Sequence, residues 1–156
     1  MEYLANEKRP ALVLGDRLEQ LQRLAGELDG MVDGVEYICG QSSRKARQAA
    51  LERMKAGESC VLFATYSLAK EGLDIPRLER LYLLTPHRDK VAIQQAVGRI
   101  MRPAEGKGKP VVYDFVDEQE GLCMSQYRSR KAVYRKLGCI IDESRLKAYQ
   151  VKIKGA

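Results

Sequence analysis

The sequence predicts an α/β fold in which a mostly parallel sheet is flanked by helices on both faces. Short apolar runs alternate along the chain with longer segments whose apolar residues recur at helical spacing, and this alternation is typical of βαβ units. The run SCVLFAT (59–65) is almost continuously apolar, as expected for a strand that helices cover on both sides. The 156 residues are enough for one domain with a substantial hydrophobic core.

The first half of the chain predicts three strands separated by two helices. ALVLG (11–15) and VEYIC (35–39) are short apolar runs, and the leucines between them recur at the spacing of a helix over about 16–28. The segment SSRKARQAALERMKAG is predicted to form a second helix, which begins at a serine cap and ends at Gly57. The run at 59–65 is the third strand.

The second half predicts two further strands, each followed by a helix. RLYLLT (80–85) leads into a helix from about 89 to 102, which Pro103 ends. PVVYDFVD (110–117) leads into a last helix over about 120–137. The intervening segment ATYSLAKEGLDIP (64–76) is predicted to be a loop at the carboxyl edge of the sheet, where α/β proteins of this kind bind ligands.

The composition favours a polyanionic partner and gives no indication of a membrane span or a metal site. Lys and Arg number 27 against 21 Asp and Glu, an excess that solubility alone would also explain. No apolar run approaches the roughly 20 residues of a membrane span. The four cysteines form no CxxC pair and His87 is the only histidine. We therefore expect buried, reduced thiols in a cytoplasmic protein without a metal centre.

Two arginines on the predicted helix at 89–102 raise the question of function. Gln95, Arg99 and Arg102 recur at i, i+4 and i+7, so they project from one face, and Gly98 leaves room beside them for a ligand or another backbone. Arginine donates bidentately to phosphate, but an exposed arginine face is equally common. We expect the opposite face to pack on the sheet through Val91, Ala92, Ala96, Val97 and Met101.

The predicted loop at 64–76 favours the phosphate interpretation. Thr65 and Ser67 offer hydroxyl groups directly after the third strand, and Gly72 and Asp74 occupy a tight turn from which the carboxylate can reach an arginine or a ribose hydroxyl. The structural alternatives are a turn-capping role for Asp74 and helix-capping roles for Thr65 and Ser67.

Several segments together resemble the superfamily 2 helicases and translocases. TYSLAKEGLDIP resembles motif V of that family, and QAVGRIMR matches the Q-x-x-G-R-x-x-R pattern of motif VI. Upstream, ALVLGDRLEQLQRLAGEL resembles motif IV with its helix, and the stretch from Gly40 to Thr65 is similar to the run that precedes motif V. The resemblance covers about residues 10–117 and implies the second, C-terminal RecA-like motor domain, a three-layer fold.

The resemblance implies roles at a nucleotide for five residues. Arg99 and Arg102 are similar to the arginine fingers that contact the γ-phosphate of ATP held by a neighbouring domain, and Gln95 matches the motif VI glutamine near that phosphate. Gly72 and Asp74 match the G-x-D of motif V, which contacts the ribose and couples to motif VI.

The same resemblance implies contacts with a nucleic-acid backbone. Thr65 and Ser67 correspond to motif V residues that touch this backbone, and Arg47, with Arg44 beside it, lies in the helix region that adds further contacts. For Arg44 and Lys45 a plain exposed helix face explains the sequence equally well.

The parts that bind the nucleotide itself are absent from these 156 residues. GKGKP (106–110) lacks the first glycine and the hydroxyl residue of a P-loop. VVYDFVDEQE looks like a Walker B strand, but in the family that motif precedes motifs V and VI, whereas this segment follows them. We therefore expect Asp114 and Asp117 to be structural acids. The resemblance therefore implies that this chain contributes only half of an ATPase site. ATP and Mg²⁺ would be bound mainly by an N-terminal RecA-like domain, and the isolated domain would be inactive.

We accordingly expect the C-terminal motor domain of a longer ATP-dependent helicase, an ATP hydrolase. Residues 1–9 would be an interdomain linker, residues 10–141 the helicase C-terminal RecA-like domain and residues 142–156 a basic tail. The partners implied are the N-terminal domain and nucleic acid, with no membrane.

The residues in and after motif VI favour DNA over RNA as the nucleic-acid substrate. Gln94-Gln95 stands where DEAD-box proteins have His-Arg, and R-x-x-x-Y-x-x-x-G (Arg130 to Gly138) is similar to phage, restriction and repair motors. An RNA-directed helicase domain, a stand-alone RecA-like binding or regulatory module, and an α/β nucleotide-binding domain of another kind remain open alternatives.

The last predicted helix carries basic residues that either add a phosphate-facing patch or lie on a solvated face, which we favour. These residues are Arg128, Arg130, Lys131, Arg135 and Lys136. We expect the other side of this helix to pack through Leu122, Tyr127, Val133 and Leu137.

Overall fold

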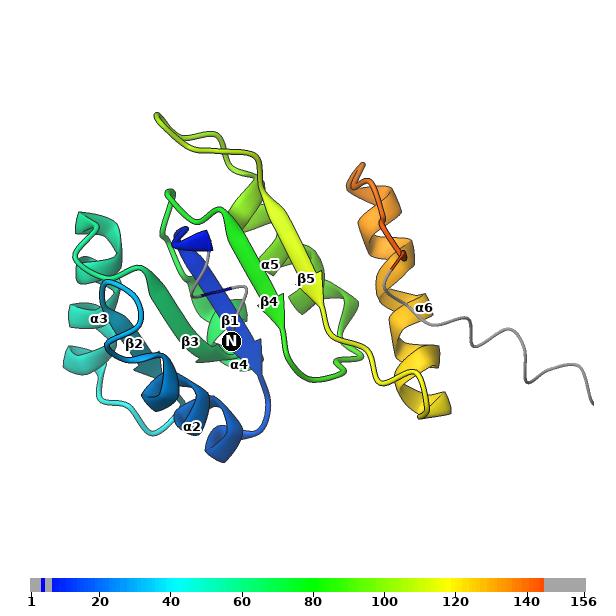
Figure 1. Ribbon diagram of the computed structural model, residues 1–156, viewed down its shortest axis with the longest axis horizontal. Helices are drawn as coiled ribbons and strands as arrows, with labels where there is room; N and C mark the ends of the chain where they lie inside the picture. The colour runs from blue at the N-terminus through cyan, green and yellow to red at the C-terminus, as the bar shows by residue number, and fades with distance from the viewer. Residues whose placement is uncertain (1–3, 5–6, 145–156) are drawn as a thin grey trace, which may run out of the picture.

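The computed structural model describes Leu4 and residues 7–144, which form a parallel five-stranded sheet in the order β2-β3-β1-β4-β5 (Figure 1). The strands are β1 (Ala11–Gly15), β2 (Val35–Ile38), β3 (Val61–Thr65), β4 (Arg80–Leu83) and β5 (Val111–Asp114). The helices are α2 (Leu18–Leu28), α3 (Arg44–Ala56), α4 (Tyr66–Gly72), α5 (Lys90–Met101) and α6 (Gly121–Lys136). The predicted strands and the four predicted helices are confirmed.

Helices cover both faces of the sheet, as the apolar runs predict. On one face, α2 buries Leu21 and Leu28 against Val13 and Phe63 of the central strands. The other helices lie on the opposite face, where their apolar residues form the larger core cluster with Leu12 and its neighbours. All five residues of β3 are buried, so the prediction that this strand is covered on both sides is confirmed, and all five residues of β1 are buried as well.

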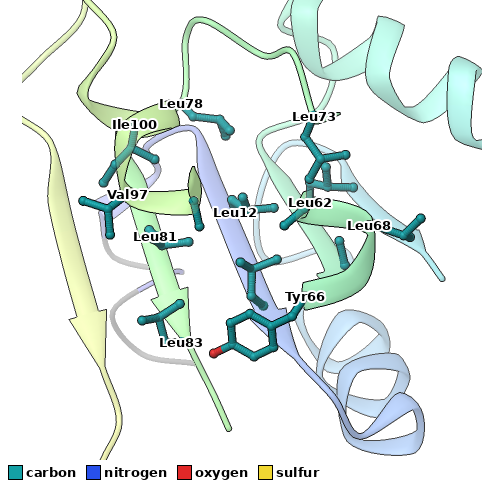
Figure 2. Close-up of a cluster of buried hydrophobic side chains, with 14 of the residues drawn as sticks. Leu12, Leu62, Tyr66, Leu68, Leu73, Leu78, Leu81, Leu83, Val97 and Ile100 are labelled. Atoms are coloured by element: carbon teal, nitrogen blue, oxygen red, sulfur yellow. The ribbon is translucent and has the colours of Figure 1, made fainter. Parts of the chain in front are cut away.

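The larger core cluster gathers leucines from three adjacent strands under α4 and α5 (Figure 2). Leu12, Leu62 and Leu81 occupy matching positions in the parallel ladders, so their side chains point to the same face of the sheet. Figure 2 shows Tyr66 at the edge of this cluster, with its hydroxyl group directed toward β4. This packing fixes α4 and α5 side by side above the central strands.

Local signals set the ends of α3 as the sequence predicts. The Ser43 hydroxyl accepts a hydrogen bond from the Ala46 amide at 3.1 Å and caps the helix. Gly57 follows the last turn with φ of +82°, the left-handed conformation that glycine adopts without strain. Its amide donates to the carbonyls of Arg53 and Met54, which satisfies the helix end.

Three expectations about local structure are wrong. The segment after β3 is not a loop, because residues 66–72 form α4. On α5, Val91 and Met101 are exposed, and Ile93 and Ile100 are buried in their place beside the expected Ala92, Ala96 and Val97. On α6, Leu122 is exposed, whereas the expected Tyr127 and Val133 are buried.

Within Leu4 and residues 7–144, no helix is long and apolar enough to span a bilayer. The same residues contain no cluster of His, Cys, Asp and Glu that would hold a metal ion. All four cysteines are free thiols. Cys39 is buried as expected, but Cys60, Cys123 and Cys139 are only partly buried. Of the expected basic tail, residues 145–156 lie outside the described part of the chain.

A buried ion pair joins α6 to the edge strand β5. Arg130 is 2% exposed and donates two hydrogen bonds of 2.8 Å to the carboxylate of Asp114, and the Tyr134 hydroxyl donates a third of 2.6 Å. Asp114 therefore has the structural role that we expect from the sequence. Arg130 cannot belong to a phosphate-facing patch, because its guanidinium faces the core. The R-x-x-x-Y spacing places both donors on one side of α6.

We predict that Asp114→Asn destabilises the chain by about 3–5 kcal/mol, because it leaves the charge of Arg130 buried without a counterion. Urea unfolding followed by circular dichroism measures the loss. Asp117→Asn is the matched control, since Asp117 is exposed and accepts a hydrogen bond from the Gln119 amide. Equal stability of the two variants would contradict the structural role of this pair.

Candidate functional site

The ends of α4 and α5 bring together the residues of the two predicted nucleotide motifs. Helix α4 ends at Gly72, whose φ of +111° favours glycine and turns the chain toward α5. A Cβ atom at this position would lie 4.0 Å from the Arg99 guanidinium. Leu73 and Asp74 therefore lie directly beside the two arginines.

Arg99 is anchored to the end of α4. Its Nη1 atom donates a 2.7 Å hydrogen bond to the carbonyl oxygen of Leu73. Burial lowers the pKa of this guanidinium, as does the nearby charge of Arg102, while Asp74 opposes the change. The Nε atom is buried without a hydrogen-bond partner, so this half-buried cation retains an unused donor.

Arg102 is held more loosely. Its Nη1 atom lies 3.1 Å from Oδ1 of Asp74, and the two side chains are 58% and 65% exposed. Exposed ion pairs of this kind contribute about 0–1 kcal/mol. The guanidinium can therefore leave Asp74 for a stronger anion at little cost, and phosphate is an anion that it can bind bidentately.

Gln95 and Gly98 leave the surface beside the arginines open. Gln95 is exposed on α5, one turn before Arg99. A Cβ atom at Gly98 would have no atom within 4 Å from other parts of the described chain, Leu4 and residues 7–144. The space that the sequence predicts beside Arg99 is present and faces outward.

Thr65 and Ser67 lie at the carboxyl end of β3, on a different part of the domain surface. Their hydroxyl oxygens are 3.0 Å apart, with Thr65 buried and Ser67 exposed. Thr65 occupies the N-cap position of α4, as the capping alternative expects, but its side chain makes no capping hydrogen bond.

The two arginines of α3 differ in their surroundings. Arg44 is exposed in the first turn of the helix. Arg47 donates to the carbonyls of Gly40 at 2.8 Å and Ser42 at 3.1 Å, and its Nη1 lies 3.4 Å from a carboxylate oxygen of Glu71 on α4. In this structure Arg47 holds the loop before α3 against α4, while Arg44 remains accessible.

Residues 1–104 match the protein family described as helicase conserved C-terminal domain. This chain is a member of that family. A probable helicase of Escherichia phage T5 is 30% identical over 133 residues, which cover 85% of this chain and 29% of that protein. A protein of Acanthamoeba polyphaga mimivirus, named as an ATP-dependent RNA helicase, is 32% identical over 129 residues and is matched over 23% of its length. The chain thus spans less than a third of either relative.

The solved structures show the same fold. The C-terminal domain of the DEAD-box protein Dbp5 superposes with a TM-score of 0.69 at 18% identity, covering 90% of this chain and 79% of that one. The five-stranded parallel sheet with helices on both faces is therefore the RecA-like fold, shared with this helicase C-terminal domain. This confirms the fold and the family expected from the sequence.

Sequence reasoning missed the residues that position α4 in this helicase domain. The Tyr66 ring stacks on His87, with centroids 4.0 Å apart, and its hydroxyl donates to the carbonyl of Thr85 at 3.0 Å. Nδ1 of His87 lies 3.0 Å from a carboxylate oxygen of Asp16. These contacts tie the carboxyl ends of β1, β3 and β4 together. In the sequence, Tyr66 stands out only as an aromatic residue between the hydroxyl residues Thr65 and Ser67, which does not predict these contacts.

Asp89 links the same helix to the start of α5. Its carboxylate accepts the amides of Val91 at 2.9 Å and Ala92 at 3.1 Å, and it also binds the Lys70 ammonium on α4. The hydrogen bond from Lys70 is the largest cause that lowers the pKa of Asp89 to about 2, and the Ala92 amide adds to it. One carboxylate therefore caps α5 and fixes it to α4.

We predict that Lys70→Met raises the pKa of Asp89 from about 2 toward its ordinary value of 3.8, because its main charged donor is lost. A carboxylate with a lowered pKa stabilises the fold fully above 3.8 and loses this contribution as the pH falls toward 2. The stability advantage of wild type over Lys70→Met should therefore shrink below pH 4. Carbon-13 NMR titration of the Asp89 carboxyl measures the shift, with Lys45→Met as the control. An unchanged titration in Lys70→Met would contradict the contact.

Proposed function

We propose that this chain is the second motor domain of an ATP-dependent DNA helicase or translocase, in which Arg99 and Arg102 act as arginine fingers. One observation carries the proposal: Arg99 and Arg102 meet Leu73 and Asp74 on one open surface, although the two segments are more than 20 residues apart. A cationic surface that is accessible and weakly neutralised is suited to stabilise charge that develops on a phosphate held elsewhere.

ATP with Mg²⁺ would be held mainly by an N-terminal RecA-like domain, because the printed sequence contains no P-loop and no Walker B motif. In this arrangement Gly72 and Asp74 approach the ribose and Gln95 lies near the γ-phosphate. The family match supports such a two-domain motor. The domain boundaries proposed are a linker over residues 1–9, a motor domain over 10–141 and a basic tail over 142–156.

Nucleic acid would bind along the carboxyl edge of the sheet. The hydroxyl groups of Thr65 and Ser67 lie where β3 passes into α4, and a hydroxyl donates readily to a phosphate oxygen. Arg44, exposed in the first turn of α3, adds a charge that can neutralise one phosphate. Arg47 would contribute through the loop that it holds.

DNA is the proposed substrate because motif VI lacks the His-Arg of the DEAD-box pattern. The mimivirus relative is named as an RNA helicase, which makes an RNA-directed domain the second candidate. A stand-alone module that supplies arginines to a partner ATPase is the third. Assays with single-stranded DNA, duplex DNA and RNA discriminate the first two, and the length of the natural gene product tests the third.

We predict that Arg102→Ala or Arg99→Ala in the intact gene product lowers kcat for ATP hydrolysis on the order of 10³-fold, because the γ-phosphate loses a cation in the transition state. Nucleotide binding, measured with a fluorescent ATP analogue, should change little. Arg128→Ala, an exposed position on α6, is the control. Strong ATPase activity of the 156-residue chain alone, lost on Arg102→Ala, would overturn the proposal that this chain contributes only half of an ATPase site.

We predict that the double variant Thr65→Ala with Ser67→Ala weakens binding of single-stranded DNA by about tenfold, since two hydrogen bonds to phosphate are lost. The salt dependence should stay the same, because no charge is removed. Arg44→Ala should instead reduce the slope of log affinity against log salt by about one. Fluorescence anisotropy measures both, with Ser125→Ala as the exposed control. Stronger binding to RNA than to DNA would favour the second candidate.

A further inference from the structure

The segment RPAEGKGKP (102–110) has the glycines and lysines of a phosphate loop without its spacing, and the structure gives it a different arrangement. The Lys107 amide donates to the carbonyl of Ala104 at 3.3 Å, and Gly106 has φ of +70° within this turn. The Gly108 amide donates at 2.9 Å to the buried carboxylate of Glu79. The backbone on both sides of Lys107 is therefore fixed.

The Lys107 ammonium bridges the two segments that carry Arg102 and Asp74. Its Nζ atom donates at 2.6 Å to the carbonyl of Arg102 and at 3.3 Å to the carbonyl of Pro76, two residues beyond Asp74. Burial lowers the pKa of this lysine, and the charge of Glu79 opposes the change. A partly buried cation at the C-terminal end of α5 also interacts favourably with the helix dipole.

These contacts form a closed arrangement around the proposed arginine finger. The side chain of Arg102 is joined to Asp74, and the main chain of Arg102 is joined through Lys107 to the segment that follows Asp74. The exposed ion pair is weak and would break when Arg102 moves to a phosphate. The Lys107 bridge involves only backbone carbonyls, so it can persist after that movement.

We propose that Lys107 is a positioning residue for ATP hydrolysis, which sets the placement of Arg102 and Asp74 relative to each other. It does not touch the nucleotide but fixes the two backbones from which these side chains extend. This inference rests on the proposed function, because it matters only if Arg102 acts on a phosphate. The segment 102–110 thereby has a role in the part of the ATPase site that this chain contributes.

The proposal is tested in the intact gene product by steady-state ATPase kinetics of Lys107→Met and Lys107→Arg. Methionine keeps much of the apolar stem and removes the donors, whereas arginine keeps both charge and donors. We expect Lys107→Met to lower kcat by about tenfold or more, as a small misplacement of a catalytic group does, with unchanged KM for ATP. Lys107→Arg should restore most of the loss. Lys109→Met, an exposed lysine two residues later, is the matched control.

A double variant separates positioning from a general structural effect. In the Arg102→Ala background, Lys107→Met should cause little further loss of kcat, because the group that it positions is gone. An equal fold loss in both backgrounds, or wild-type kcat in Lys107→Met while Arg102→Ala is impaired, overturns the inference alone. Wild-type activity of Arg102→Ala itself overturns the proposed function. Thermal unfolding of each variant identifies any loss of kcat that follows from unfolding, which would also count against the inference.

Discussion

All residues of β1 and β3 are buried, so side chains from helices must cover both sides of the sheet centre. Helix α2 serves one face, and α4 and α5 serve the other across the leucines of the larger core cluster. This requirement places α4 directly against α5, although the two helices are separated in the chain by β4. The surface that carries Arg99, Arg102 and Asp74 is formed where these two helices end. It therefore depends on the burial of strands that contribute no residue to it.

The contacts between α4 and α5 differ in strength along their length. At the start of α5, Asp89 caps the helix and binds Lys70, and Tyr66 is enclosed by His87 and the carbonyl of Thr85. At the other end, Arg99 has one buried hydrogen bond to Leu73, whereas the pair of Arg102 with Asp74 is exposed. The two helices are thus held together at the end where we propose that nucleic acid binds, whereas the exposed ion pair of Arg102 can exchange its partner at little cost.

The sequence predicts the long periodic elements well because each carries its own signals. The ends of α3 follow from Ser43 and Gly57, and the continuous apolar run of β3 follows from its burial on both faces. Helix α4 is missed because its seven residues are too few to show a periodic stripe and begin with Tyr and Ser. Packing of Tyr66, Leu68 and Ala69 into the core stabilises it instead. The exposure of Val91 and Met101 is missed because residue spacing alone does not specify which side of α5 packs against the rest of the domain.

By itself the sequence determined the α/β class, the order of the five strands and the four longer helices, and the family, because apolar periodicity and motif order can be read along the chain. It also predicted Gln95, Arg99 and Arg102 on one helix face, although α5 ends at Met101 and Arg102 follows it as the C-cap residue with non-helical backbone angles. Only the tertiary structure decided which of these side chains is anchored and which is free, since Leu73 and Asp74 reach them across more than 20 residues of chain. The same holds for Arg130, which turns inward to Asp114, and for Lys107, whose two carbonyl partners lie on separate segments. Such contacts depend on three-dimensional distance, which a linear pattern does not specify.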